Sequence, residues 1–209
     1  MTRGFSVYLD LLRFGAAMVV LMSHAGYPRF TEGRWLWVRE LNLGSDAVIV
    51  FFVLSGLVIA HVAQARPGGI GRFAFDRATR LLSVALPALA LGWALDRLGT
   101  SLAPQVYPGP LHNPLPLWEQ LLRGVTFSNE WGALATRLGS NGPFWSLSYE
   151  AAYYALFAVA FYTRGARRAA LLLAGAALFG LNVLLLMPAW LMGVALQARL
   201  RRGGLPGGA

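Results

Sequence analysis

Long apolar runs, separated by short segments rich in arginine or in proline and glycine, dominate this chain of 209 residues. A helix needs about 20 mostly apolar residues to span a bilayer. By this measure the pattern predicts spans over 5–26, 44–65, 81–98, 144–162 and 169–186, with a shorter apolar run over 188–200. It also predicts loops over 27–43 and 100–116, a basic hinge over 66–80, and an interfacial or re-entrant segment over 117–127. We therefore expect an all-α fold, a polytopic transmembrane helix bundle with about five to six spans.

The composition narrows the class further. Charged residues make up 13% of the chain, against about 25% in soluble domains, and the mean hydropathy is +0.53. The chain has no cysteine, so we expect neither a disulfide framework nor a cysteine metal site, and we predict no bound metal. The net charge of +9 comes from arginine alone, which in so apolar a chain indicates a lipid bilayer with anionic headgroups as partner and no nucleic acid. We expect a single domain over 1–202 and a flexible tail over 203–209.

The distribution of arginine predicts the orientation in the membrane. Short loops dense in arginine face the cytoplasm, and the densest of them lie at 66–80 and 164–168. The first span is therefore expected to begin inside, which places His24 near the outer face. Trp145 lies near the outer face as well if the 117–127 segment does not cross, and inside if it does. The sequence leaves both possibilities open.

Two ionisable side chains in the first apolar run, Arg13 and His24, are eleven positions apart. Eleven steps of about 100° bring them to the same face of a helix, roughly 16 Å apart along its axis. Asp10, one turn before Arg13, is placed to pair with it. Arg13 alone could extend to the lipid headgroups, and His24 alone could be an ordinary interfacial histidine. Because a charge inside a membrane span usually faces a bundle or a wet cavity, we predict that both face one cavity, with His24 as a general base.

Smaller signals lie in the second span and at the start of the third. Ser55 and Gly56 predict a place where another helix comes close. Arg77 and Arg80 lie one turn apart where the third span begins. The residues alone support two interpretations of this pair equally: anchoring of a helix end in the cytoplasm, and bidentate binding of phosphate.

The stretch NGPFWSLSYEAAYY, residues 141–154, brings polar groups into an apolar helix. Trp145 suits the membrane interface, and Ser148 and Tyr153 add hydroxyl groups along the helix. Glu150 is a second costly charge within the membrane, and it needs a partner or a wet site. We predict that it either pairs with an arginine or orients His24 or a substrate hydroxyl.

Four stretches, LDLLRFGAAMVVLMSH, FFVLSGLVI, RATRLL and PFWSLSYEAAYY, follow one another along the chain. In this order and spacing they resemble the membrane-bound acyltransferase 3 family, the sugar O-acetylases of O-antigen and nodulation-factor type. The resemblance covers about residues 8–157, and WLMGVALQARL near the end is similar to a later family helix. The chain departs from the family at Ile49, where many members have an acid, and at Ala151 and Ala152, where polar residues usually follow the glutamate. The family domain has more helices than this chain supplies, so we expect the last ones to be missing.

The resemblance implies an activity and roles for individual residues. The family moves an acyl group, commonly acetyl, from cytoplasmic acyl-CoA to a carbohydrate hydroxyl at the bacterial inner membrane, with acyl-CoA as donor substrate and no tightly bound cofactor. The expected catalytic residues are His24, Glu150 and Arg13. The expected substrate-binding residues are Arg77, Arg80, Asp10, Ser55, Trp145, Ser148 and Tyr153.

Two other functions compete with acyl transfer. Arginine, histidine and glutamate inside a helix bundle also suit a proton-coupled transporter or flippase. The chain lacks the internal repeat that is typical of transporters, which weakens this alternative. An inactive truncated remnant is the other alternative.

Overall fold

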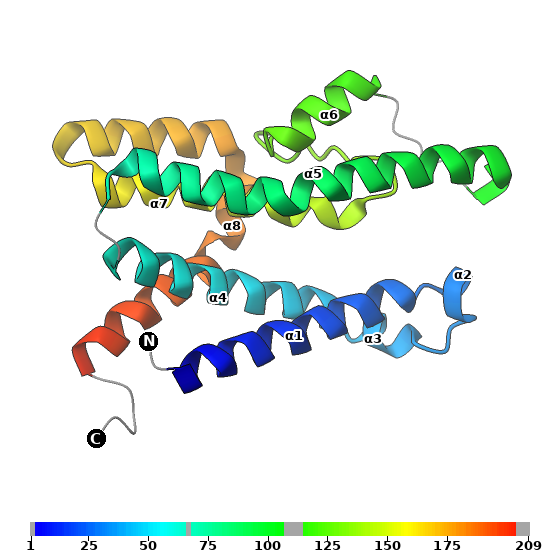
Figure 1. Cartoon of the computed structure of the whole chain (residues 1–209), viewed down its shortest axis with the longest axis horizontal. Coiled ribbons are helices and arrows are strands. Elements are labelled where there is room, and N and C mark those ends of the chain that lie inside the picture. The colour runs from blue at the N-terminus through cyan, green and yellow to red at the C-terminus, as the bar shows by residue number, and fades with distance from the viewer. Residues whose placement is uncertain (1–2, 66–67, 107–114, 204–209) are drawn as a thin grey trace. The chain divides into compact units, whose positions relative to one another are not determined.

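The computed structural model describes residues 3–65, 68–106 and 115–203 (Figure 1). The helices are α1 (Arg3–Ala25), α2 (Pro28–Thr31), α3 (Leu36–Glu40), α4 (Leu43–Ala65), α5 (Ile70–Leu102), α6 (Leu117–Val125), α7 (Trp145–Tyr162) and α8 (Gly165–Gly203). Two short 3₁₀ turns, η1 (Pro104–Val106) and η3 (Gly142–Phe144), complete the regular structure. No β-strand occurs in the described ranges, and the all-α fold predicted from the sequence is confirmed.

Four of the described helices, α1, α4, α5 and α8, are long and apolar enough to cross a membrane by length and composition. The predicted number of five to six spans is therefore approximate. The 18-residue helix α7 coincides with the predicted span 144–162, and its first turns carry serine and glutamate. The nine residues of α6 rise about 14 Å, less than half of a hydrocarbon core of about 30 Å. This length suits the interfacial placement predicted for the segment.

The structure differs from the sequence prediction mainly at helix ends. The predicted loop 27–43 contains α2 and α3, and most of the predicted hinge 66–80 belongs to α5, since arginine is a good helix former. The spans predicted over 169–186 and 188–200 form one helical run, α8, which passes through Pro188 and instead breaks at Gly180, where φ is 82°. Residues 107–114 of the predicted loop and 204–209 of the predicted tail lie outside the described residues.

The chain forms two compact units, which are described separately. The first unit combines Met1–Arg66 with Met187–Ala209. Within it α1 packs along α4 (Figure 1). Its buried core includes Leu9, Leu54 and Leu57, against which Phe5 and Leu200 pack. These contacts place the start of α1 beside the ends of α4 and α8.

The second unit, Pro67–Leu186, is built on the antiparallel pair α5 and α7. The ring of Phe73 near the start of α5 lies 5.9 Å from that of Phe157 and 5.7 Å from that of Tyr162, both near the end of α7. α6 packs on α5, and the buried Gly124 gives it close contact with Leu89.

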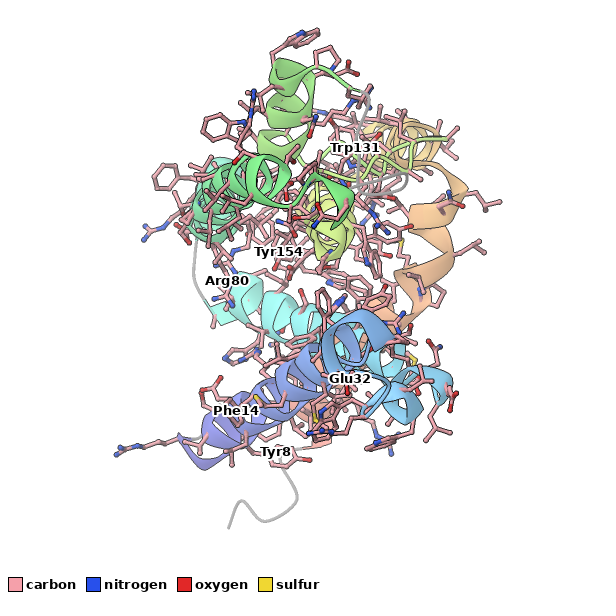
Figure 2. The ribbon with its side chains drawn as sticks, turned by 90° about the vertical axis from the view of Figure 1, so that its right-hand side faces the viewer. Tyr8, Phe14, Glu32, Arg80, Trp131 and Tyr154 are labelled. Carbon is pink, nitrogen blue, oxygen red and sulfur yellow. The ribbon has the colours of Figure 1, made fainter. Side chains whose placement is uncertain are left out.

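Large apolar side chains cover the outer surface of the membrane-length helices. On α1, Tyr8 is 55% exposed and Phe14 is 66% exposed, and both lie away from the face that packs on α4 (Figure 2). A water-soluble domain would bury most such side chains, whereas lipid tails accommodate them without cost. This surface fits a multi-pass membrane protein.

Close contact between α4 and the last part of α8 depends on two glycines. A Cβ atom added at Gly56 would overlap the carbonyl oxygen of Trp190, and one added at Gly193 would overlap that of Val53 and lie 2.7 Å from the nitrogen of Leu57. Both glycines are buried. The backbones meet without intervening side chains, as Ser55 and Gly56 predict, and small residues are the usual means of such packing in membranes.

We predict that Gly193→Ala lowers the thermal unfolding midpoint of the purified chain in detergent, because the added methyl group must push two backbones apart. Overpacking of this kind costs about 1–3 kcal/mol. The matched control is Gly15→Ala on α1, where a Cβ atom meets nothing within 4 Å. It is expected to keep or raise the midpoint, since alanine favours a helix over glycine. Equal midpoints for the two variants, measured by circular dichroism, would contradict the close contact.

Candidate active site

Arg13 forms the predicted ion pair with Asp10 on α1. Arg13 Nη1 lies 2.7 Å from Asp10 Oδ1, and the side chains are 30% and 66% exposed. Leu9 and Ala16, about one turn to either side of Arg13, are buried in the first unit. The guanidinium group therefore lies at the edge of the α1 face that packs on α4, with its charge balanced by a more exposed carboxylate.

His24 lies in the last turn of α1 and is exposed. The carbonyl oxygen of the preceding Ser23 accepts a hydrogen bond of 2.9 Å from Arg39 Nη1, and the Arg39 guanidinium lies 3.5 Å from the ring centroid of Tyr27. Thr31 Oγ1 donates to the Ala25 carbonyl oxygen at 3.1 Å. The α2–α3 segment thus satisfies carbonyl groups at the end of α1 that the helix itself leaves without partners. His24 makes no hydrogen bond within the described part of the chain, so its ring nitrogens are available to a substrate.

Ser55 has a packing role in the first unit. Its hydroxyl oxygen accepts a hydrogen bond of 3.3 Å from Trp190 Nε1, and Trp190 is fully buried. The predicted contact of Ser55 with substrate stays a prediction.

Arg77 and Arg80 lie on the first half of α5 in the second unit. Arg77 is partly buried, whereas Arg80 is exposed on the surface (Figure 2). Neither forms a salt bridge with any residue that the structure describes. Their guanidinium donors, one helical turn apart, are therefore free to bind an anion.

Glu150 on α7 accepts a hydrogen bond from the hydroxyl of Tyr154, one turn further along the helix. Tyr154 is buried, and its position within the second unit is visible in Figure 2. A tyrosine hydroxyl thus supplies one partner for the costly carboxylate. The predicted pairing with an arginine, or orientation of His24 or a substrate hydroxyl, stays a prediction. Within the second unit this arrangement holds one carboxylate oxygen in a defined position.

The other α7 residues predicted to bind substrate make contacts within the second unit, and their contact with substrate stays a prediction. The Tyr153 hydroxyl donates to the Val183 carbonyl oxygen at 2.7 Å, and the ring of Trp145 meets that of Tyr149 edge to face at 5.1 Å. Ser148, fully buried, donates to the carbonyl oxygen of Phe127 and accepts from the backbone N–H of Glu130 at 3.3 Å. Through these two hydrogen bonds, Ser148 attaches the segment between α6 and α7 to α7, the helix that carries Glu150.

Asn129 and Glu130 belong to this polar cluster, and sequence reasoning missed them. Asn129 is 1% exposed and donates from Nδ2 to Glu130 Oε1 at 3.2 Å. Its Oδ1 and the Nε1 of Trp131 are buried and have no hydrogen-bond partner among the described residues. Burial raises the pKa of Glu130 above its ordinary value of 4.5, and the hydrogen bond from Asn129 opposes part of this rise. Buried polar atoms without partners beside a carboxyl group of raised pKa are typical of a functional site.

A signal for this cluster is present in the sequence as three consecutive polar residues, 128–130, between two apolar segments. Such a triplet usually marks a turn, because serine and asparagine favour turns and the charged side chain of glutamate favours exposure to solvent. Only the contact with buried Ser148 distinguishes it from an ordinary loop.

The structure places the candidate residues in two groups. Asp10, Arg13, His24 and Ser55 belong to the first unit, and Arg77, Arg80, Trp145, Ser148, Glu150 and Tyr153 belong to the second. A meeting of His24 with Glu150 or with the arginines of α5 stays a prediction. Among the described residues, no group of three or more histidine, aspartate and glutamate side chains is arranged to hold a metal ion.

These helices and polar residues define a multi-pass membrane protein with ionisable groups on its apolar helices. Residues 6–196 match the family described as acyltransferase domain, and the chain belongs to this family. It is similar to Acyltransferase MdmB of Streptomyces mycarofaciens, with 30% identity over 150 residues, 70% of this chain and 36% of that protein. The chain thus spans about a third of the length of this relative. No solved structure matches it.

The raised pKa of Glu130 predicts how stability depends on pH. A carboxyl group whose pKa is higher in the folded state stabilises that state fully below its unfolded value, near 4.5, and this contribution disappears as the pH rises through the folded value. Glu130→Gln lacks this titration. We expect the unfolding midpoint of the variant, relative to that of the natural chain, to rise between pH 4 and pH 8 in thermal melts in detergent.

The control is Glu32→Gln, which changes an exposed glutamate on the first unit. Its midpoint is expected to follow that of the natural chain across the same pH range. A constant difference between Glu130→Gln and the natural chain would show that burial does not disfavour the charged carboxylate at this position.

Proposed function

We propose that the chain acts as an integral membrane acyltransferase in the bacterial inner membrane. In this proposal it moves an acetyl group from cytoplasmic acyl-CoA to a hydroxyl of a cell-surface carbohydrate or glycolipid. The observation that carries the proposal is the family match over residues 6–196, which includes every candidate residue on both units. The similarity to Acyltransferase MdmB supports the same class of reaction.

Arg77 and Arg80 are proposed to bind the phosphate groups of acyl-CoA. Guanidinium groups bind phosphate oxygens through two parallel hydrogen bonds. Neither of these side chains forms a salt bridge with an acidic residue in the described ranges. Their place near the start of α5 lies in a stretch dense in arginine, which by the positive-inside rule faces the cytoplasm, where acyl-CoA is present.

His24 is proposed as the general base. A neutral ring nitrogen would accept the proton of the acceptor hydroxyl while that oxygen attacks the thioester carbonyl carbon. The bond between carbon and sulfur then breaks, an ester forms, and the CoA thiolate leaves and takes up the proton. Arg13, held by Asp10 and roughly 16 Å along the helix from His24, is proposed to help hold the phosphate groups of acyl-CoA.

Glu150 is proposed to position the reacting groups. In this proposal its carboxylate, which accepts a hydrogen bond from Tyr154, orients the second nitrogen of His24 or an acceptor hydroxyl. Such a contact would fix the tautomer of the histidine, as carboxylates do for other catalytic histidines.

The absence of cysteine makes a direct assay possible, because a thiol reagent reports only the CoA released. In proteoliposomes containing the 209-residue chain, acetyl-CoA and a set of methyl glycosides as acceptors, we expect release of CoA that depends on the acceptor. His24→Gln should lower the rate about 100-fold or more, the usual contribution of a general base. The control Glu32→Gln, an exposed change on the same unit, should leave the rate unchanged.

Each other result has a defined meaning. A His24→Gln variant of normal rate would refute the role of the histidine. Uptake of labelled glycoside without any release of CoA would instead favour a transporter. A chain that shows neither reaction, although it is folded by circular dichroism, would refute the proposal that these residues suffice for acyl transfer.

Arg77→Gln and Arg80→Gln test the phosphate contacts. Each should raise the KM for acetyl-CoA about tenfold, as expected for a lost hydrogen bond to a charged group, with little change in kcat. With S-acetyl-N-acetylcysteamine, a thioester without phosphate, both variants should match the natural chain. The control Arg97→Gln alters an exposed arginine on α5 that is outside the candidate site. An equal loss with both thioesters would show that the arginines act on structure instead of phosphate.

A further inference from the structure

A cavity of about 280 Å³ lies in the first unit, where α1 begins and where α4 and α8 end. It is lined by Phe5, His61, Gln64, Ala65, Gln197, Leu200 and Arg201. These residues come from three helices that are far apart in the sequence, and none of them is part of the candidate active site. None of them is acidic. The proposed acyl transfer therefore does not explain the cavity.

Hydrogen bonds between α4 and α8 order the polar side of the cavity. Gln197 on α8 is buried, with 5% of the residue exposed, and its Nε2 lies 3.1 Å from His61 Nδ1. An amide nitrogen can only donate, so in this arrangement Nδ1 accepts and the imidazole carries its proton on Nε2. One turn further along, Arg201 Nη1 donates to Gln64 Oε1 at 2.7 Å. Two glutamines thus hold a histidine and an arginine in place.

The charge of the cavity favours an anion. Arg201 forms no salt bridge with any described residue, and its bond to Gln64 occupies only one of its five N–H donors. The last turn of α8 also carries Arg202, so two positive charges offset the negative end of the helix. A guanidinium fork and a ring N–H, with no acidic side chain among the lining residues that the structure describes, form a suitable site for phosphate oxygens.

The apolar side of the cavity distinguishes between sources of phosphate. Phe5, Ala65 and Leu200 provide no hydrogen-bond donors from their side chains, so a free phosphate ion gains nothing from them. A lipid does gain from contact with these apolar side chains, because its glycerol and first methylene groups continue from the phosphate toward the hydrocarbon. The cavity also lies at the ends of membrane-length helices, the depth at which headgroups occur.

We infer that this cavity is a binding site for one anionic glycerophospholipid, with the headgroup phosphate on Arg201 and His61 and the glycerol end beside Phe5 and Leu200. Gln64 and Gln197 act as positioning residues for the two donors. The inference is independent of acyl transfer, because it uses none of the residues assigned to that reaction.

Native mass spectrometry of the purified 209-residue chain in detergent tests the site directly. We expect one phosphatidylglycerol molecule to bind more tightly than phosphatidylcholine with the same acyl chains. Arg201→Gln should weaken phosphatidylglycerol binding about tenfold, the effect of one lost charge-assisted hydrogen bond. The matched control Arg202→Gln removes the same charge from the adjacent exposed position, which does not line the cavity, and should change binding less than twofold.

A second variant guards against misfolding. Gln64→Leu keeps Arg201 and removes the oxygen that holds it, so binding should weaken by a smaller factor than in Arg201→Gln, with unchanged circular dichroism. Equal weakening by Arg201→Gln and Arg202→Gln would overturn the site in favour of diffuse surface charge. Displacement of the lipid by millimolar inorganic phosphate or CoA would overturn the lipid as ligand and identify a soluble phosphate in its place.

Discussion

A polar group inside an apolar helix must find a partner, because lipid offers no hydrogen bonds and an unsatisfied group costs several kcal/mol. This constraint accounts for several side-chain contacts among the described residues. Asp10 balances Arg13, Tyr154 donates to Glu150, and Tyr153 reaches a carbonyl oxygen of α8. Each contact also restricts the conformation of a polar side chain within its own unit.

Glycines determine where segments of the chain approach closely enough for these contacts. In the first unit, Gly56 and Gly193 let α4 and α8 meet backbone to backbone, and this contact brings His61 and Gln197 within hydrogen-bond distance. In the second unit, the positive φ of Gly180 breaks α8, and the carbonyl oxygen of Phe179 accepts the N–H of Gly132 at 2.9 Å. The loop that carries Glu130 is thereby attached to α8 as well as to α7.

The two proposals give arginine different roles on the two units. Arg77 and Arg80 lie on one helix and offer donors from neighbouring turns, which suits a ligand with several phosphates. Arg201 is oriented by a glutamine beside an apolar wall, which suits one phosphate attached to hydrocarbon. The same guanidinium chemistry thus points to a soluble donor in one place and to a lipid in the other. The difference comes from the neighbouring side chains and not from the charge.

The sequence alone determined the class of fold and its helices, since apolar runs of membrane length permit little else. The spans 5–26 and 44–65 differ from α1 and α4 by at most two residues at each end, and the spacing of Asp10 and Arg13 correctly predicted an ion pair. The family resemblance, carried by four short stretches, was confirmed over residues 6–196. The spans and the ion pair depend on local periodicity and composition, and the resemblance depends on short motifs, all of which are visible in the sequence alone.

The tertiary structure determined the features that depend on contacts between residues far apart in the sequence. Nothing local distinguishes residues 128–130 from a surface turn, and only the docking of Glu130 on Ser148 places a carboxyl group of raised pKa in the second unit. His61 had no evident role by itself, because its partner Gln197 is 136 positions away in the sequence. The tyrosine partner of Glu150 and the break at Gly180 likewise required coordinates. The burial of a side chain and its hydrogen-bond partner depend on several segments of the chain at once. The periodicity of one segment carries no information about them.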